Sequence, residues 1–119
     1  MSQTIKRIEC GPRMSQAVVH NGTVYLAGQV APASAGASVR EQTLAILARI
    51  ESLLAQAGTD KTKLLSASIW LADMSTFAEM NEVWDQWVPA GCAPARATVE
   101  ARLASPDYRV EIAVVAAIG

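Results

Sequence analysis

The most regular alternation of apolar and polar residues lies near the end of the chain, over residues 93–118. It forms two stretches separated by Ser105-Pro106-Asp107. A period of two is typical of a β-strand with one buried face. The pattern therefore predicts two strands joined by a turn, a C-terminal hairpin. Arg96 and Glu111 stand inside this otherwise apolar strand sequence, where a bare charge is costly. They are the first candidates for a functional role.

Earlier patterns predict three strands, a helix, another strand and a second helix. Two apolar runs flank Asn21-Gly22, a dipeptide that favours a tight hairpin because both central residues need positive φ. A helical apolar stripe begins after Ser38, with Glu41 completing a capping box, and ends at Gly58. The expected elements before the C-terminal hairpin are strands at 4–9, 17–20 and 23–27, a helix at 38–57, a strand at 64–72 and a helix opening at 73–76.

This order, β-β-β-α-β-α-β-β, predicts a single α+β domain over residues 1–119, with two helices on one face of a mixed sheet. In the second helix, Thr76 and Glu79 match another capping box. Asn81 lies within the apolar stripe of that helix. Because a buried amide needs partners, we expect it to bind a neighbouring backbone group, with a catalytic role as the alternative. The fourth strand is expected to place Leu65, Ala67, Ile69 and Leu71 on one face and Leu64, Ser66, Ser68 and Trp70 on the other.

Composition narrows the class of protein. The chain has 119 residues, of which 51% are apolar and 18% charged, with a formal net charge of -1 and no basic run. The charge balance disfavours nucleic-acid binding, and the apolar content favours self-association. No apolar run is long enough to span a membrane, and the start of the chain lacks the apolar core of a signal sequence. Cys10 and Cys92 lack metal-site spacing and are expected to be reduced thiols, although a disulfide stays open. We therefore expect a cytoplasmic protein.

Motifs for phosphate, zinc or nucleophile-elbow chemistry are missing from the sequence, and His20 is the only histidine. We expect His20 to be an exposed residue beside the first hairpin turn. Arg96 and Glu111 remain as candidates. A guanidinium matches a carboxylate bidentately, and a nearby carboxylate can activate water or return a proton. Together they suit a small substrate that carries its own carboxylate. The alternative is a structural ion pair.

Four stretches resemble a known family. They are G-P-R-M-S-Q-A-V at 11–18, Y-L-A-G-Q-V at 25–30, P-A-R-A-T-V-E at 94–100 and V-E-I at 110–112. Together they are similar to the reactive-intermediate deaminase family, also called RidA or YjgF-like and formerly described as L-PSP endoribonuclease. The resemblance implies a chorismate-mutase-like fold, a homotrimer and ligand clefts between subunits. It also implies hydrolysis of enamine/imine intermediates, such as 2-aminoacrylate and its imine, to 2-keto acids and ammonia without a cofactor or metal.

The resemblance also implies roles for individual residues. Arg96 matches the arginine that binds the substrate carboxylate, and Glu111 the glutamate that handles the attacking water. Thr98 takes a position whose backbone N–H assists the carboxylate. Gly28 matches a glycine that lines the cleft. Asn81 matches a helix asparagine often found there.

Two positions depart from the family pattern. Met14 stands in the region where tyrosine often follows Gly-Pro, and Ala27 replaces a serine often found before Gly-Gln. These departures favour an alternative function, a non-catalytic trimer that binds a small carboxylate metabolite such as a keto acid. RNA cleavage ranks last, because no histidine pair could serve as acid and base.

Spacing in the predicted hairpin puts Arg96 and Glu111 roughly 13 Å apart, at about 3.3 Å per residue. We therefore expect the two side chains to meet across a subunit interface rather than within one chain.

Overall fold

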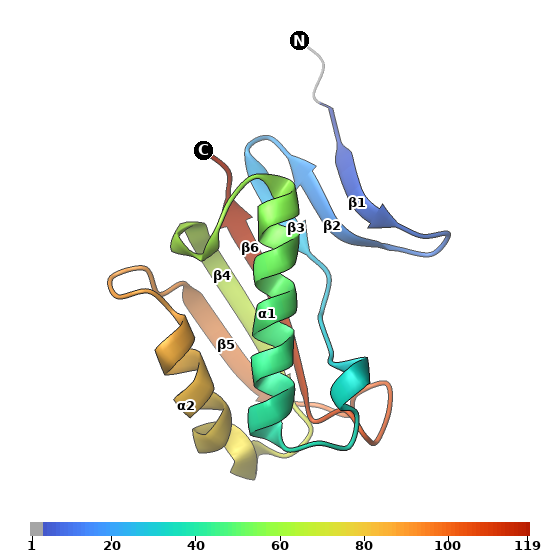
Figure 1. Cartoon of the computed structure of the whole chain (residues 1–119), viewed down its shortest axis with the longest axis vertical. Coiled ribbons are helices and arrows are strands. Elements are labelled where there is room, and N and C mark those ends of the chain that lie inside the picture. Colours follow the sequence, from blue (N-terminus) through green and yellow to red (C-terminus); the bar gives the residue numbers. More distant parts are fainter. Residues whose placement is uncertain (1–3) are drawn as a thin grey trace.

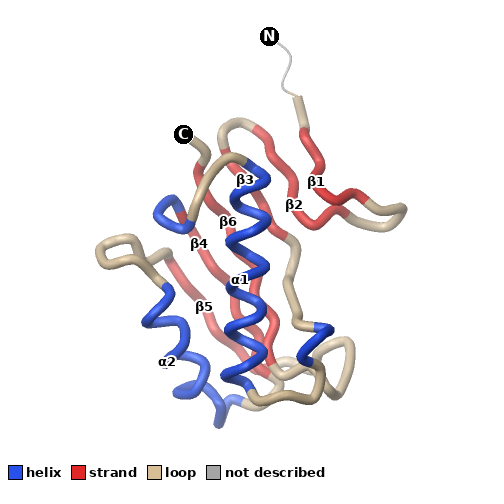
Figure 2. Tube along the Cα trace, viewed as in Figure 1, coloured by secondary structure: helices blue, strands red, loops and turns tan. Residues whose placement is uncertain are grey.

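A computed structural model describes residues 4–119 as one six-stranded sheet with two helices against the same face (Figures 1 and 2). The first three residues, part of the segment considered for a signal sequence, lie outside the described chain. The strands are β1 (Lys6–Cys10), β2 (Ser15–His20), β3 (Thr23–Leu26), β4 (Leu64–Leu71), β5 (Ala95–Glu100) and β6 (Val110–Ala117). The helices are α1 (Val39–Ala57) and α2 (Phe77–Trp87), with short 3-10 turns at Pro32–Ser34, Lys61–Lys63 and Met74–Thr76. The α+β prediction and its element order are confirmed.

Local sequence signals account for the first hairpin and for α1. Asn21 and Gly22 both adopt positive φ, 56° and 72°, between β2 and β3. Ser38 caps α1, since its hydroxyl accepts a hydrogen bond from the Glu41 N–H at 3.1 Å. Gly58 ends the helix in the left-handed region at φ 86°. The apolar stripe of α1 is buried against the sheet as predicted: Ile46, Leu47, Ile50, Leu53 and Leu54.

The predicted C-terminal hairpin is wrong. The strand order across the sheet is β1-β2-β3-β6-β4-β5, so β4 lies between the two strands that were expected to pair (Figure 1). β4 is parallel to β5, with α2 as the crossover, and antiparallel to β6. Because β4 lies between β5 and β6, the backbone N–H and C=O groups along both of its edges form hydrogen bonds, as a mostly buried strand requires. The segment after β5 is therefore a wide loop around the end of β4 instead of a tight turn.

A buried glutamine holds this loop. Gln42 of α1 is fully buried, and its Nε2 donates to the carbonyls of Ala37 at 3.1 Å and Asp107 at 2.9 Å. Its Oε1 accepts from the backbone N–H of Arg109 at 2.8 Å. One side chain thus joins the start of α1 to the residues that lead into β6.

Two smaller expectations also fail. A register shift between Leu64 and Ser66 turns Leu64 inward and leaves Leu65 50% exposed, because the irregularity reverses the alternation at the start of β4. Thr76 makes no side-chain cap to α2. Asp73 instead accepts from the Ser75 N–H at 2.9 Å, so the chain enters the helix through a capped 3-10 turn. This hydrogen bond from Ser75 lowers the pKa of the Asp73 carboxyl.

The sheet has a helix-covered face and an open face. β6 alternates strictly, with Val110, Ile112 and Val114 buried under the helices and Glu111 on the open face. β5 also alternates, but it has its polar residues on the helix-covered face. Its polar residues point toward α2, and Val99 on the open face is 49% exposed.

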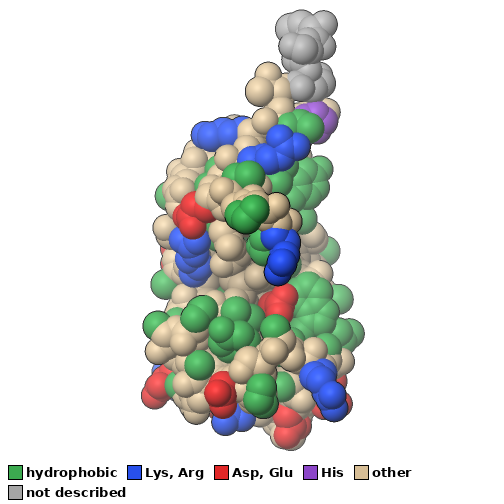
Figure 3. Space-filling model, turned by 90° about the vertical axis from the view of Figure 1, so that its right-hand side faces the viewer, with side chains coloured by type: hydrophobic (Ala, Val, Ile, Leu, Met, Phe, Trp, Pro, Cys, Tyr) green, Lys and Arg blue, Asp and Glu red, His purple; other side chains and the backbone are tan. Residues whose placement is uncertain are grey.

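Charged side chains are dispersed over one side of the molecule (Figure 3). The edge of the molecule shown in Figure 3 carries Lys and Arg scattered among other residues, without a continuous basic patch.

Cys10 and Cys92 are free thiols, as expected. Within residues 4–119, neither helix is both long and apolar enough to cross a membrane. The same residues contain no cluster of three His, Cys, Asp or Glu suited to a metal ion.

Candidate functional site

Arg96 belongs to strand β5, which lies beside helix α2 (Figure 1), and its side chain contacts that helix. Its Nη1 donates to Oδ1 of Asn81 at 2.8 Å. Its Cζ lies 5.7 Å from the ring centroid of Phe77 and 5.4 Å from that of Trp84. Because these three residues stand at i, i+4 and i+7 on one face of α2, all of them reach the same guanidinium. Asn81 therefore binds the Arg96 side chain and not a backbone group, which corrects the expectation.

The guanidinium of Arg96 has no acidic partner. Among residues 4–119 the ion pairs are Arg40–Glu82, Arg49–Glu9 and Lys61–Glu51. Arginine carries five N–H donors, and the structure gives one of them to Asn81. A partly buried cation in this state favours an anion as its further partner.

Thr98 lies two residues beyond Arg96 on the same face of β5. Its Oγ1 is buried and has no hydrogen-bond partner among the described residues. Such an unpaired buried hydroxyl costs free energy unless a ligand or water binds it. We call Asn81, Arg96 and Thr98, together with Phe77 and Trp84, the arginine half of the candidate site.

Glu111 and Gly28 meet at a second place. A Cβ built on Gly28 would lie 2.0 Å from Glu111 Oε2, so the Glu111 side chain occupies the space above this glycine. The backbone next to Gly28 is fixed, since Gln29 exchanges both backbone hydrogen bonds with Ile112 of β6 at 2.8 and 3.1 Å. Glu111 forms no ion pair within residues 4–119. Its side chain borders a shallow depression of about 250 Å³ with Trp70.

Met14, at the turn of the β1–β2 hairpin, lies near Gly28 but in a different pocket from the one that Glu111 borders. Met14 and Gly28 line one pocket of about 500 Å³, between the hairpin and the end of β3. Arg49 of α1 lines this pocket from the other side. We call Met14, Gly28 and Glu111 the glutamate half of the site.

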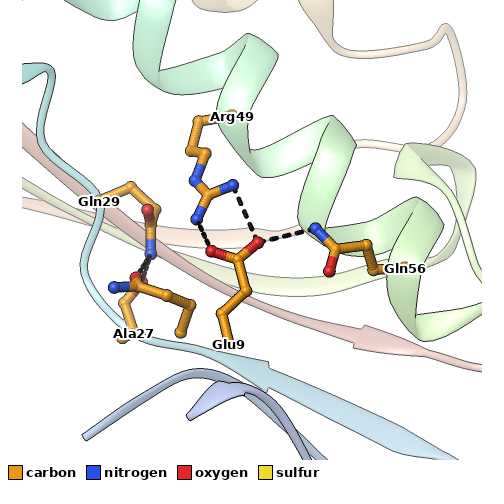
Figure 4. Close-up of polar contacts among 6 residues, drawn as sticks. Glu9, Ala27, Gln29, Arg49 and Gln56 are labelled. Carbon is orange, nitrogen blue, oxygen red and sulfur yellow. Dashed lines mark hydrogen bonds and ion pairs between the residues drawn. The ribbon is translucent and has the colours of Figure 1, made fainter. Parts of the chain in front are cut away.

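A polar cluster fastens the hairpin to helix α1 (Figure 4). Arg49 binds both carboxylate oxygens of Glu9, and Gln56 Nε2 donates to Glu9 Oε2 at 2.9 Å. These hydrogen bonds, the one from Arg49 above all, lower the pKa of the Glu9 carboxyl. Glu9 itself has φ 50°, an uncommon conformation for this residue type. The contacts with α1 therefore hold the hairpin close to its turn, where Met14 is placed.

Gln29, the residue after Gly28, makes a second link to the hairpin (Figure 4). Its side chain is buried, and its Nε2 donates to Gln16 Oε1 at 2.9 Å and to the Ala27 carbonyl at 3.0 Å. Gln16 belongs to β2, so the amide pair joins the hairpin to the segment that carries Gly28.

The two halves do not come together within one chain. Arg96 pairs with Ala67 on the helix-covered side of β4, whereas Glu111 pairs with Trp70, three residues along on the open side. Two strand spacings across the sheet and three residues along it separate the Cα atoms by roughly 14 Å. The side chains also leave opposite faces of the sheet. No single small molecule can touch both side chains of the same chain.

Sequence reasoning missed Phe77 and Trp84. They follow helical spacing and look like ordinary core residues, although Phe77 is 39% exposed. Helical spacing relative to Asn81 was the available signal. It could not show that β5 brings Arg96 beside them, because the parallel pairing of β4 and β5 is not evident from the sequence.

Comparisons with known proteins agree with the resemblance of the motifs. The family model described as Endoribonuclease L-PSP matches residues 4–118. The RutC family protein YoaB of Escherichia coli is 47% identical over 115 residues, covering 97% of this chain and 99% of its own length. A protein of Bos taurus named 2-iminobutanoate/2-iminopropanoate deaminase is 34% identical over 110 residues, covering 88% and 80%.

Solved structures show the same fold. The crystal structure of NMB1025 from Neisseria meningitidis, described as a member of the YjgF protein family, has a TM-score of 0.94 and 47% sequence identity. The match covers 98% of this chain and 96% of that one. The chain therefore belongs to the RidA/YjgF-like family, whose model carries the description Endoribonuclease L-PSP.

Proposed function

We propose that the protein is a deaminase that hydrolyses 2-imino acids, and their enamine tautomers, to 2-keto acids and ammonia. The observation that carries the proposal is Arg96, a partly buried cation held by Asn81 and two aromatic rings and left without an acidic partner. A guanidinium so arranged suits a substrate carboxylate. The name of the bovine relative, an imino acid deaminase, supports the same class of reaction.

In the proposed reaction, Arg96 binds the carboxylate of the 2-imino acid, and Thr98 offers a further hydrogen bond. Glu111 takes a proton from a water molecule while the water oxygen bonds to the imine carbon. Glu111 returns this proton to the imine nitrogen, which gives a carbinolamine. The hydroxyl proton then passes to the nitrogen as the C=O bond forms, the C–N bond breaks, and ammonia leaves with the C–N electron pair. The products are a 2-keto acid and ammonia, so one water is consumed and no redox partner is needed.

We further propose that each site joins two subunits of a homotrimer, with the arginine half from one subunit and the glutamate half from the next. The roughly 14 Å separation and the opposite faces of the sheet support this arrangement. Apolar side chains on the open face also support assembly, because Tyr25, Leu65 and Val99 are each about half exposed in one chain.

Activity is tested with imines produced in situ from amino acids by an amino-acid oxidase, measuring keto-acid release against the spontaneous rate. Arg96→Ala is expected to remove the acceleration, and Arg40→Ala, an exposed arginine elsewhere on α1, to keep it. Full activity in Arg96→Ala would rule out the site assignment.

Subunit complementation tests the shared site. Arg96→Ala and Glu111→Gln are each expected to be inactive alone. When the two variants are mixed and reassembled, random trimers regain about one quarter of their sites, because each restored site needs an intact half from each variant. Recovery of no activity in verified mixed trimers would place both residues in one chain's own site.

Met14 and Ala27 favour the second candidate, a binding module without turnover, because neither side chain supplies a hydroxyl. Calorimetric binding of a keto acid, together with no acceleration across a panel of imines, would select this alternative. RNA cleavage that survives rigorous nuclease removal and disappears in Glu111→Ala would contradict both.

A further inference from the structure

Arg96 lies within a continuous row of aromatic and cationic side chains. Phe77 and Trp84 are separated by two helical turns, about 10.5 Å along α2. The Cζ of Arg96 is 5.7 Å from one ring centroid and 5.4 Å from the other, so the guanidinium lies between the two rings. Trp84 contacts Trp87 at 5.5 Å between centroids, and Lys61 Nζ lies 5.3 Å from the Trp87 ring. These five side chains form one connected row.

We propose that Phe77 and Trp84 are positioning residues for carboxylate binding, which act by holding the guanidinium of Arg96. The inference rests on the proposed function and adds residues that neither the motifs nor the comparisons identify. It follows from the small number of polar contacts that hold the Arg96 guanidinium. No acid holds the guanidinium, and one hydrogen bond to Asn81 leaves it free to rotate about that contact. The two rings attract the cation and block rotation on two sides.

The two rings contribute differently because their exposures differ. Trp84 is 5% exposed and is fixed in the core by packing and by the contact with Trp87. Phe77 is 39% exposed at the first turn of α2, so it forms the outer wall beside the guanidinium. The open side of Arg96 that remains between them is where a carboxylate can approach.

The test compares two kinds of variant. Leucine variants keep an apolar side chain but lose the aromatic ring, and the others replace one aromatic ring by another. Phe77→Leu and Trp84→Leu are expected to weaken pyruvate binding three- to tenfold in calorimetry, and to raise KM for imine hydrolysis with kcat changed less than twofold. A ring that only positions the anchor acts equally on bound substrate and transition state. Phe77→Tyr and Trp84→Phe are expected to keep wild-type values. Leu44→Ala, which removes a half-exposed apolar residue from α1, is the control.

A double variant separates positioning from general stability. In an Arg96→Ala background, Phe77→Leu is expected to cause no further loss of pyruvate binding, because the ring acts through the guanidinium. Equal losses in both backgrounds would overturn the proposal, as would unchanged KM in both leucine variants of an active enzyme.

A third measurement does not depend on activity. The NMR signal of the Arg96 Nε–H is expected to be sharp and slow to exchange in wild type, and to broaden in Phe77→Leu. If wild type neither binds pyruvate nor hydrolyses imines, the proposed function fails, and this signal alone decides the positioning role. A signal that is identical in both proteins would refute it.

Discussion

Replacement of Gly28 by alanine would displace Glu111 without removing it. The new Cβ would lie 2.0 Å from Glu111 Oε2, 2.9 Å from Cδ and 3.2 Å from Cγ. Contacts below 3.0 Å are essentially never made by real Cβ atoms, and the atoms in the way belong to a flexible side chain. The carboxylate must therefore retreat by at least about 1 Å, whereas the backbone can stay where it is.

The expected effect on catalysis is large, and the effect on folding is small. A shift of about 1 Å in a group that must align with its substrate can lower the rate about 10²-fold, equivalent to about 2.7 kcal/mol of activation free energy. Gly28 is not among the glycines with positive φ, so alanine suits its backbone. The melting temperature of Gly28→Ala should stay at or slightly above that of wild type, since alanine restricts the unfolded chain.

The assay is keto-acid release from oxidase-generated imines, measured beside thermal unfolding. Gly11→Ala is the matched control, because its new Cβ meets only the Met14 carbonyl at 3.6 Å, an ordinary contact. Gly28→Ala combined with Glu111→Asp shortens the acid and should not be worse than Glu111→Asp alone. If Gly28→Ala hydrolyses imines at the wild-type rate, the position of Glu111 does not matter, and the role assigned to it is wrong.

Three further outcomes are expected. Gln42→Leu removes three buried hydrogen bonds and should lower the free energy of unfolding by about 3 kcal/mol in urea titrations; an unchanged value would show that water replaces them. The lowered pKa of Glu9 means that its stabilising contacts persist above the usual glutamate pKa of about 4.3 and are lost as the pH falls through the lowered value. Hydrogen exchange in the β1–β2 hairpin should therefore accelerate in acid beyond its intrinsic pH dependence, and Glu9→Gln should show no such transition. Thr98→Val should leave unfolding unchanged or slightly raise its free energy, because the hydroxyl has no partner, while calorimetry shows weaker pyruvate binding.

Features set by neighbouring residues were predictable from the sequence. Asn21-Gly22 fixes a hairpin through backbone conformation alone, and Ser38 with Gly58 sets the limits of α1. The open-face position of Glu111 also followed from simple alternation, because β6 is regular throughout. These signals act over a few residues, so no knowledge of distant pairing was needed.

Pairing between distant strands was not predictable in the same way. Nothing in the sequence around Arg96 shows that β4 lies beside it, because parallel strands are joined through a whole helix. The partners of Asn81 and the orientation of β5 both depend on that pairing. The estimate of the Arg96–Glu111 distance was similar in size to the distance in the sheet, but the hairpin geometry behind it was wrong. The structure adds that the Arg96 and Glu111 side chains leave opposite faces of the sheet.

The central position of β6 has a consequence for how the chain folds. β6 is the last of the six described strands in chain order, yet it lies between β3 and β4, and Thr23 of β3 pairs with its Ala117. Before β6 arrives, the β1–β2–β3 and β4–β5 segments have no strand pairing with each other, so the early chain holds two separate partial sheets. Such long-range pairing slows folding. Loss of β6 would split the sheet in the middle, whereas loss of β1 would shorten only one edge.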